Sequence, residues 1–464
     1  MMTITEIKQQ IVQKSARRVI EDILQTAETN SQYNALVSLT RERAVMRADA
    51  VDAGDITGPL AGVPFVVKDN FLAHGAPTTA ASKMLENFHA PLQATAVEKL
   101  EAAGAICIGK ANLDAFAHGG STENSIYGPT LNAADVSRVA GGSSGGSAVV
   151  TALGIVPFAL GTDTGGSIRQ PASFNGIVGV KPTYGAVSRY GVVAMASSTD
   201  TIGAFALTTK DASVVMDIIA GKDENDMTTI DEFFALEDAP KPAQKIGVIK
   251  EFMSDDIDDD VRRVTLEYIA ELRRAGHTVE EVSLPIVKHT LAMYYIIVPA
   301  EISSNLARYD GIRYGFRAEG VTTLAELYGR TRDLGFVTEN KRRIMIGSYV
   351  LSSGYFDAYY QQAQKARTVL VNELHNLFES FDVLIGPVAP TPAFKIGEKT
   401  SDPIKMYLAD VMTVPASLAG VPAISVPAGK STSGLPIGVQ LIGNYKSDAQ
   451  LLSLAQSIEE MKRG

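Results

Sequence analysis

Apolar residues recur at helical spacing near the start of the chain. From residue 5 to residue 29 they return at intervals of three or four, which places them on one face of a helix. The positions are Ile7, Ile11, Val12, Ala16, Val19, Ile20, Ile23 and Leu24. The pattern predicts one helix over residues 5–29, and a second helix is predicted over residues 39–53.

Farther along, short apolar runs alternate with helical patterns. The predicted strands cover residues 61–69, 105–112, 156–163, 176–182 and 245–252, and the predicted helices cover residues 94–103, 147–154, 209–220 and 258–275. Strands that alternate with helices are typical of a sheet with helices on both faces. We therefore expect an α/β fold built around a large, mixed and mostly parallel sheet.

The whole chain of 464 residues is expected to form one domain. Residues 1–57 should supply N-terminal helices, and residues 58–220 should carry the chemical groups. Residues 221–245 are polar and acidic and end in prolines, which indicates a surface excursion. Residues 246–464 should complete the sheet and the substrate pocket. Their segment 289–374 should be largely helical and should cover one side of the sheet.

An acidic run at residues 254–260, SDDIDDD, invites comparison with a calcium-binding loop. The EF-hand pattern requires a glycine at its sharp turn and a closing glutamate, and both are absent here. Carboxylates are favourable at the N-terminal end of a helix, where the helix dipole is positive. The run therefore predicts the start of the helix over residues 258–275.

The charge balance argues against a chain that grips nucleic acid by itself. The net charge is −10 and the isoelectric point is near 5.3, whereas nucleic-acid-binding proteins usually present a basic face. The longest basic run is only Lys341-Arg342-Arg343. If the protein acts on a nucleic acid, a partner must hold it.

The single cysteine, Cys107, lies in a strand-like apolar run, which predicts a buried and unreactive thiol. The N-terminal residues lack the apolar segment of a secretory signal. No run reaches the roughly 18 uninterrupted apolar residues of a membrane span. The six histidines show no metal-ligand spacing. We therefore expect a cytoplasmic protein without a metal or cofactor in this chain.

Two serines stand in glycine-rich runs that suit catalysis. Ser143 lies in GGSSGGSA and Ser167 lies in GTDTGGSIRQPA, while Lys68 ends the apolar run GVPFVVK. A hydroxyl that attacks a carbonyl must lose its proton. A buried lysine can accept that proton, because burial makes the neutral amine accessible near neutral pH. Glycines let backbone N–H groups converge on an oxyanion.

Competing motifs do not fit. The chain has neither the G-x-x-x-x-G-K-[ST] phosphate loop nor a G-x-G-x-x-G that opens a helix after a strand. Around Ser167 the chain reads Gly165-Gly166-Ser167-Ile168-Arg169, so an arginine stands where the G-x-S-x-G nucleophile elbow has its second glycine. His118 is the histidine nearest to the glycine-rich region, and we interpret it as pocket wall rather than as a general base.

Lys68 and the two serine runs resemble the amidase signature family, with matching spacing. Other segments are similar to one branch of that family, the glutaminase subunits of tRNA-dependent Asp/Glu amidotransferases. They include NLDAFAHGGSTENSIYGPTLN, GVKPTYGAVSRYGVVAMASSTDTIG, KRRIMIGSYVLSSGYFDAYY and GLPIGVQLIG. The resemblance runs from about Leu60 to about Gly443. It implies a single amidase domain over residues 1–464, with α/β/α layers.

The resemblance implies a Ser-cisSer-Lys triad. Ser167 would be the nucleophile, Ser143 the bridging serine and Lys68 the base. The backbone N–H groups of four consecutive residues would form the oxyanion hole. These residues are Thr164, Gly165, Gly166 and Ser167. Ser144 stays open as an alternative to Ser143.

The resemblance also implies how glutamine would be held. Arg343 would bind the α-carboxylate, Asp410 would pair with the α-amino group, and Tyr294 would line the pocket. Tyr295 is an alternative to Tyr294. From the residues alone, Arg343 could equally form an ordinary ion pair on a helix surface, and Asp410 could cap a helix.

The branch implies partners and a fate for the ammonia. A second protein, the B subunit, would bind the acceptor tRNA and use ATP and Mg²⁺ to amidate Glu-tRNA(Gln) or Asp-tRNA(Asn). A small third protein, the C subunit, would complete a heterotrimer. Several positions depart from the usual wording of the family: Ala140, Thr201, Ala204 and the pair Ala117-His118, of which His118 could alter substrate fit. The alternative functions are a stand-alone amidase for another small carboxamide and a non-catalytic scaffold.

Overall fold

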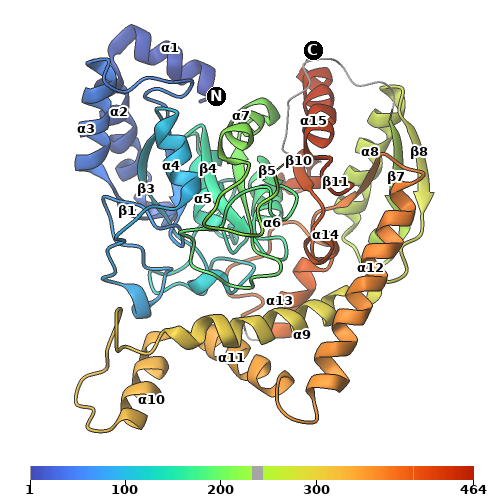
Figure 1. Cartoon of the computed structure of the whole chain (residues 1–464). Coiled ribbons are helices and arrows are strands. Elements are labelled where there is room, and N and C mark those ends of the chain that lie inside the picture. The colour runs from blue at the N-terminus through green and yellow to red at the C-terminus, as the bar shows by residue number, and fades with distance from the viewer. Residues whose placement is uncertain (1, 232–243, 401, 464) are drawn as a thin grey trace.

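The structure, a computed structural model, describes residues 2–231, 244–400 and 402–463 (Figure 1). Within these residues eleven strands form one sheet, in the order β1-β3-β2-β4-β6-β5-β10-β11-β9-β7-β8. The strands are β1 (Leu36–Leu39), β2 (Pro64–Lys68), β3 (Ile106–Ala111), β4 (Phe158–Asp163), β5 (Val178–Lys181), β6 (Thr201–Ala206), β7 (Lys245–Ile249), β8 (Thr278–Val282), β9 (Val383–Pro387), β10 (Ala423–Lys430) and β11 (Pro436–Gly443). All five strands predicted from apolar runs are present.

The large mixed sheet is confirmed, but the expectation that it is mostly parallel is wrong. Strand β2 pairs in parallel with β3 and β4, and β7 pairs in parallel with β8 and β9. The other six pairings among the described strands are antiparallel. A short connection forces this direction between β10 and β11, because only antiparallel neighbours can be joined by a tight hairpin.

The single helix predicted over residues 5–29 is two helices, α1 (Ile4–Lys14) and α2 (Ala16–Thr29). They are separated at Ser15, whose backbone φ of 142° is incompatible with a helix. The side-chain oxygen of Ser15 accepts a hydrogen bond from the Arg18 N–H. Asp52 accepts two more from Ala16 and Arg17, so the new helix start is capped from a distant helix.

The remaining predicted helices are confirmed to within a few residues. They are α3 (Arg41–Asp52), α4 (Thr95–Ala102), α5 (Gly145–Ala152), α7 (Thr209–Ile219) and α8 (Asp259–Arg274). The short α6 (Arg169–Asn175) was not foreseen. Near the C-terminus lie α13 (Pro403–Tyr407), a 3-10 turn (Leu408–Asp410), α14 (Val414–Ala419) and α15 (Asp448–Arg463).

The segment 289–374 is largely helical, as predicted. It contains most of α9 (Val287–Asn305), then α10 (Leu324–Gly335), α11 (Thr338–Val350) and much of α12 (Gln362–Phe378). Figure 1 shows α9 and α11 running side by side below the sheet, and the two helices are in contact. Together α9 and α11 cover the end of the molecule where α13 and α14 lie, and we refer to these two helices as the roof.

Two large apolar clusters, with two smaller ones beside them, form the core of the described residues. The larger one lies between the sheet and the helices α1–α5, α7, α8 and α15, and it buries Cys107. Burial raises the pKa of that thiol to about 12. The second cluster lies under the roof and includes Phe116 and Tyr294.

The two acidic segments have different outcomes. In 254–260, Asp258 accepts a hydrogen bond from the Asp260 N–H at the start of α8, which confirms the predicted helix start. The predicted excursion over residues 221–245 lies partly outside the described residues, at 232–243. Across the described ranges, no group of three or more His, Cys, Asp or Glu residues is arranged to hold a metal. No described helix is both long and apolar enough to cross a membrane.

Candidate active site

Lys68 is the last residue of β2, and its side chain is fully buried. Its amine donates to Ser143 Oγ at 2.7 Å and to Thr162 Oγ1 at 2.8 Å. Burial lowers the pKa of Lys68 to about 7, although the carboxylates of Asp114, Asp200 and Asp163 oppose the shift. The neutral amine is therefore accessible near neutral pH, as the apolar run before Lys68 predicts.

The structure distinguishes the two candidate bridging serines. Ser143 follows a cis peptide bond and lies within hydrogen-bond distance of Lys68. The hydroxyl of Ser144 instead donates to the Thr162 carbonyl at 3.1 Å. Ser143 is therefore the serine placed to exchange a proton with Lys68.

Ser167 lies in the loop between β4 and α6, and Asp163 organises this loop. The Asp163 carboxylate accepts from the N–H groups of Gly166 at 2.8 Å and Ile168 at 3.2 Å, and it pairs with Arg169 at 3.0 Å. Ser167 retains 8% exposure, and its hydroxyl makes no hydrogen bond to the described residues. The fold therefore fixes the backbone around Ser167 while its hydroxyl stays available to a ligand.

One of the four predicted oxyanion donors already has a partner within the loop. The Gly166 N–H is already committed to Asp163, because the carboxylate at the end of β4 is close enough to bind it. The N–H groups of Thr164, Gly165 and Ser167 have no hydrogen-bond partner among the described residues. These three donors are the ones free to stabilise an oxyanion.

Packing fixes the glycines of this loop. A Cβ atom at Gly165 would lie 2.7 Å from the ring of Tyr294 in α9, and one at Gly166 would lie 2.2 Å from Thr413 Oγ1. Gly166 also has a φ of +139°, which residues with side chains rarely adopt. Thr413 Oγ1 donates to the Gly165 carbonyl at 2.6 Å. The roof helix α9 and the turn before α14 thus hold the loop from two sides.

A small pocket in this region carries both a cation and an anion. Its lining includes Gly119, Gly120, Tyr295, Arg343 and Asp410. The Asp410 carboxylate lies against the backbone of Gly120, where a Cβ atom would stand 3.5 Å from Oδ1, an ordinary contact distance. Loss of hydration raises the pKa of Asp410 to about 7, and the charge of Arg343 opposes that shift.

The sequence left two roles open for Arg343, a contact with the substrate carboxylate and an ordinary ion pair on a helix surface. Arg343 does form an ion pair with Glu339 one turn earlier in α11, with Nε 2.8 Å from Oε1. The pair is not on the surface, because Arg343 is only 3% exposed. Arg343 lines the pocket, and its terminal nitrogens make no hydrogen bond to the described residues.

Tyr294 and Tyr295 both contact this region. Tyr294 packs on the Gly165 backbone, and Tyr295 lines the pocket and stacks on Tyr407 with ring centroids 3.9 Å apart. His118 is fully buried, where its Nδ1 contacts the side-chain amide of Asn340 in α11. Burial lowers the pKa of His118 well below its ordinary value.

Sequence reasoning missed three supporting residues. Asp114 accepts from the N–H groups of Thr122 and Asn124 and so shapes the loop that contains Gly119 and Gly120. Thr162 receives the second hydrogen bond of Lys68, and Glu339 binds Arg343. Asp114 and Thr162 stand close to recognised motifs, but no sequence signal reveals that Glu339 and Arg343 share a buried pair.

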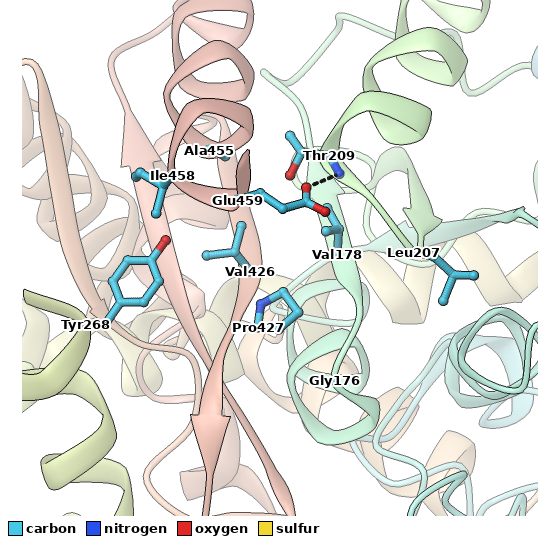
Figure 2. A pocket seen from close by; sticks show the side chains of 10 residues that line it. All are labelled: Gly176, Val178, Leu207, Thr209, Tyr268, Val426, Pro427, Ala455, Ile458 and Glu459. Atoms are coloured by element: carbon cyan, nitrogen blue, oxygen red, sulfur yellow. Dashed lines mark hydrogen bonds between the residues drawn. The ribbon is translucent and has the colours of Figure 1, made fainter. Parts of the chain in front are cut away.

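A second pocket, drawn in Figure 2, lies beside β5, β10 and α15. Its lining is mainly apolar, including Val178, Val426 and Ile458, and Glu459 accepts a hydrogen bond from the Thr209 N–H at 2.7 Å. None of the predicted catalytic or substrate-binding residues lines it, whereas Arg343 and Asp410 line the pocket described above. The site around Lys68, Ser143 and Ser167 is therefore the candidate active site.

The chain is similar to known proteins over nearly its whole length. The amidase family profile matches residues 18–452. The glutamyl-tRNA(Gln) amidotransferase A subunit from Koribacter versatilis is 48% identical, over 98% of this chain and 97% of the relative. The protein of that name from Lactiplantibacillus plantarum is 50% identical, over 93% and 90%. The crystal structure of the Thermotoga maritima protein of that name superposes with a TM-score of 0.82 at 40% identity, covering 99% of this chain and 94% of that one.

Proposed function

The chain belongs to the amidase family, and we propose that it is the glutaminase subunit of a tRNA-dependent amidotransferase. One observation carries the proposal: Arg343 and Asp410 place a cation and an anion in a single pocket. Thr413 connects this pocket to the Ser167 loop, because its hydroxyl contacts the carbonyls of both Gly165 and Asp410. A free amino acid carries both a carboxylate and an ammonium group, whereas a simple amide carries neither. The names of relatives that match nearly the full chain support the same assignment.

The proposed reaction begins when neutral Lys68 accepts a proton through Ser143 as Ser167 Oγ attacks the side-chain carboxamide carbon. A hydroxyl can donate and accept at the same time, so Ser143 can relay the proton. The oxyanion is stabilised by free backbone N–H groups of the loop. Collapse of the tetrahedral intermediate breaks the C–N bond, and the relayed proton leaves with ammonia.

The second half of the reaction consumes a water molecule. Lys68 accepts a proton from this water through the same relay while the water oxygen attacks the glutamyl ester on Ser167. Breaking the ester bond releases glutamate and returns a proton to Ser167 Oγ. Splitting amide hydrolysis into these two steps is the advantage of covalent catalysis.

Glutamine would be oriented by charge. We assign the α-carboxylate to Arg343, whose guanidinium can bind it at two points, and the α-ammonium to Asp410. Tyr294 would contact the substrate from α9, with Tyr295 beside it. The carboxamide would then face Ser167.

The proposed function requires partners. A B subunit would bind the acceptor tRNA and use ATP and Mg²⁺, and a small C subunit would complete the complex, in the cytoplasm. The relatives' name favours Glu-tRNA(Gln) over Asp-tRNA(Asn) as the acceptor. This chain would then supply ammonia and would need no cofactor of its own.

Substrate comparison tests the proposal against a stand-alone amidase. In the Arg343→Ala variant, kcat/KM for glutamine should fall about ten- to a hundredfold, because a charge-assisted hydrogen bond contributes about 1.5–3 kcal/mol. The kcat/KM for a plain aliphatic amide should change little. Equal losses on both substrates, or a wild-type preference for the plain amide, would overturn the proposal. Fluorophosphonate labelling tests the alternative of a non-catalytic scaffold. That alternative predicts that Ser167 does not react with the probe, whereas the proposed function predicts that it does.

A further inference from the structure

The carboxylate of Glu339 in α11 gathers three donors. Glu339 Oε1 accepts from Arg343 Nε at 2.8 Å and from the Tyr407 hydroxyl at 3.0 Å. Glu339 Oε2 pairs with Arg342 Nη1. The residue is only 7% exposed. Charge-assisted hydrogen bonds of this kind fix both partners in one geometry.

These contacts determine which edge of Arg343 is free. Its Nε is occupied by Glu339, and the rings of Tyr295 and Tyr407 lie 5.3 and 5.6 Å from its central guanidinium carbon. The two terminal nitrogens make no hydrogen bond to the described residues. The fork of N–H groups on these nitrogens matches the two oxygens of a carboxylate.

Glu339 also connects two segments that are far apart in the sequence. Tyr407 ends α13, directly before the turn that carries Asp410, whereas Arg343 belongs to α11. By binding Tyr407 and Arg343 through the same oxygen, Glu339 ties the cationic wall of the pocket to the segment that supplies its anionic wall.

We propose that Glu339 is a positioning residue for substrate selection, which holds Arg343 and Tyr407 so that the pocket accepts an α-amino acid amide. The inference rests on the proposed function, because it assumes that Arg343 binds the α-carboxylate. Glu339 itself need not touch the substrate. Its effect is to keep the guanidinium from rotating away from the pocket.

The test compares glutamine with a plain aliphatic amide in full-length Glu339→Ala, Glu339→Gln and Tyr407→Phe. In Glu339→Ala, KM for glutamine should rise about tenfold, within the range of a single charge-assisted hydrogen bond. The kcat for glutamine and the kcat/KM for the plain amide should stay within about twofold. Glu339→Gln keeps an acceptor oxygen for Arg343 and should recover part of the loss.

Lys341→Ala is the matched control. Lys341 lies in the same helix and pairs with Asp333 at 2.8 Å, but its side chain is 38% exposed and does not line the pocket. This variant should leave KM for glutamine unchanged. A double variant of Glu339→Ala with Arg343→Ala should bind glutamine no worse than Arg343→Ala alone, because Glu339 acts through Arg343.

The outcomes separate the two proposals. If Arg343→Ala fails to discriminate glutamine from the plain amide, the proposed function is wrong. Suppose instead that Arg343→Ala lowers kcat/KM for glutamine only, while the Glu339 variants lower kcat/KM equally for glutamine and for the plain amide. Glu339 is then only structural, and the inference is overturned. Should Glu339→Ala fail to fold, Glu339→Gln and Tyr407→Phe decide. A glutamine-selective rise in KM in either one supports the inference, and unchanged KM in both refutes it.

Discussion

At the scale of single residues, the chemistry depends on the protonation of two groups. Lys68 must be neutral to accept a proton, and Asp410 must be ionised to pair with an ammonium group. Burial lowers the pKa of Lys68 to about 7, and loss of hydration raises the pKa of Asp410 to about 7. Both groups therefore reach their working form by losing a proton in the same pH range.

The pH dependence of kcat/KM should reveal this coincidence. Below about pH 7 both groups are protonated, so the logarithm of kcat/KM for glutamine should rise with pH. On this acid limb of the profile the slope should approach two. A plain aliphatic amide does not use Asp410, so its limb should have a slope of one. Asp410→Asn should reduce the glutamine slope to one. In Lys68→Ala the residual profile for glutamine should keep a slope of one through Asp410, whereas the profile for the plain amide should become flat. A limb near pH 7 that persists for the plain amide in this variant would belong to another group.

Ser167→Ala should remove glutaminase activity while leaving the fold intact. The side-chain hydroxyl makes no hydrogen bond to the described residues, so truncation removes no internal hydrogen bond, whereas loss of a covalent nucleophile costs several powers of ten in rate. Glutamine turnover and thermal unfolding measure the two effects. Within the assembled complex, added ammonia should still support tRNA amidation. Glutamine turnover close to wild type would refute the assignment.

At the scale of elements, the close packing of α11 on α9 positions Arg343 and Glu339. Gly347 permits this contact, because a Cβ atom there would lie 1.8 Å from the Pro299 carbonyl oxygen of α9. The contact is with backbone, which cannot move aside as a flexible side chain could. A larger residue must therefore push the two helices apart.

Gly347→Ala should destabilise the protein and weaken glutamine binding together. Overpacking typically costs about 1–3 kcal/mol, and displacement of α11 moves Arg343. Gly329→Ala in α10 is the matched control, because a Cβ there has nothing within 4 Å, and it should stabilise by about 0.5–1 kcal/mol. Denaturant unfolding and KM for glutamine provide the readouts. Equal behaviour of the two variants would contradict this account of the helix contact.

At the scale of the whole molecule, the net charge of −10 is unfavourable for direct binding of tRNA, although the proposed role is in tRNA chemistry. Phosphate backbones are bound through Lys and Arg, and their contribution falls steeply with salt. The isolated chain should therefore leave tRNA unshifted in a gel at about 0.15 M salt. The assembled complex should retain tRNA. Salt-dependent binding by the isolated chain alone would show that it holds the acceptor itself.

The sequence by itself identified the elements with strong local patterns and the groups with distinctive chemistry. Apolar runs revealed β2 and β4, and the glycines around Ser143 and Ser167 marked the loops. Lys68 was identified because its apolar approach predicts burial. These features could be predicted because each depends on residues that are neighbours in the chain.

Only the tertiary structure decided how distant segments meet. Strand direction depends on connections across the whole sheet, so the six antiparallel pairings were not visible in local patterns. The break at Ser15 is capped by Asp52, and the Gly166 N–H is taken by Asp163. Glu339 binds Tyr407 across 68 positions of sequence. Hydrogen bonds act through space, so the partner of a buried polar group is set by the fold, whereas the chemical type of that group is set by the sequence.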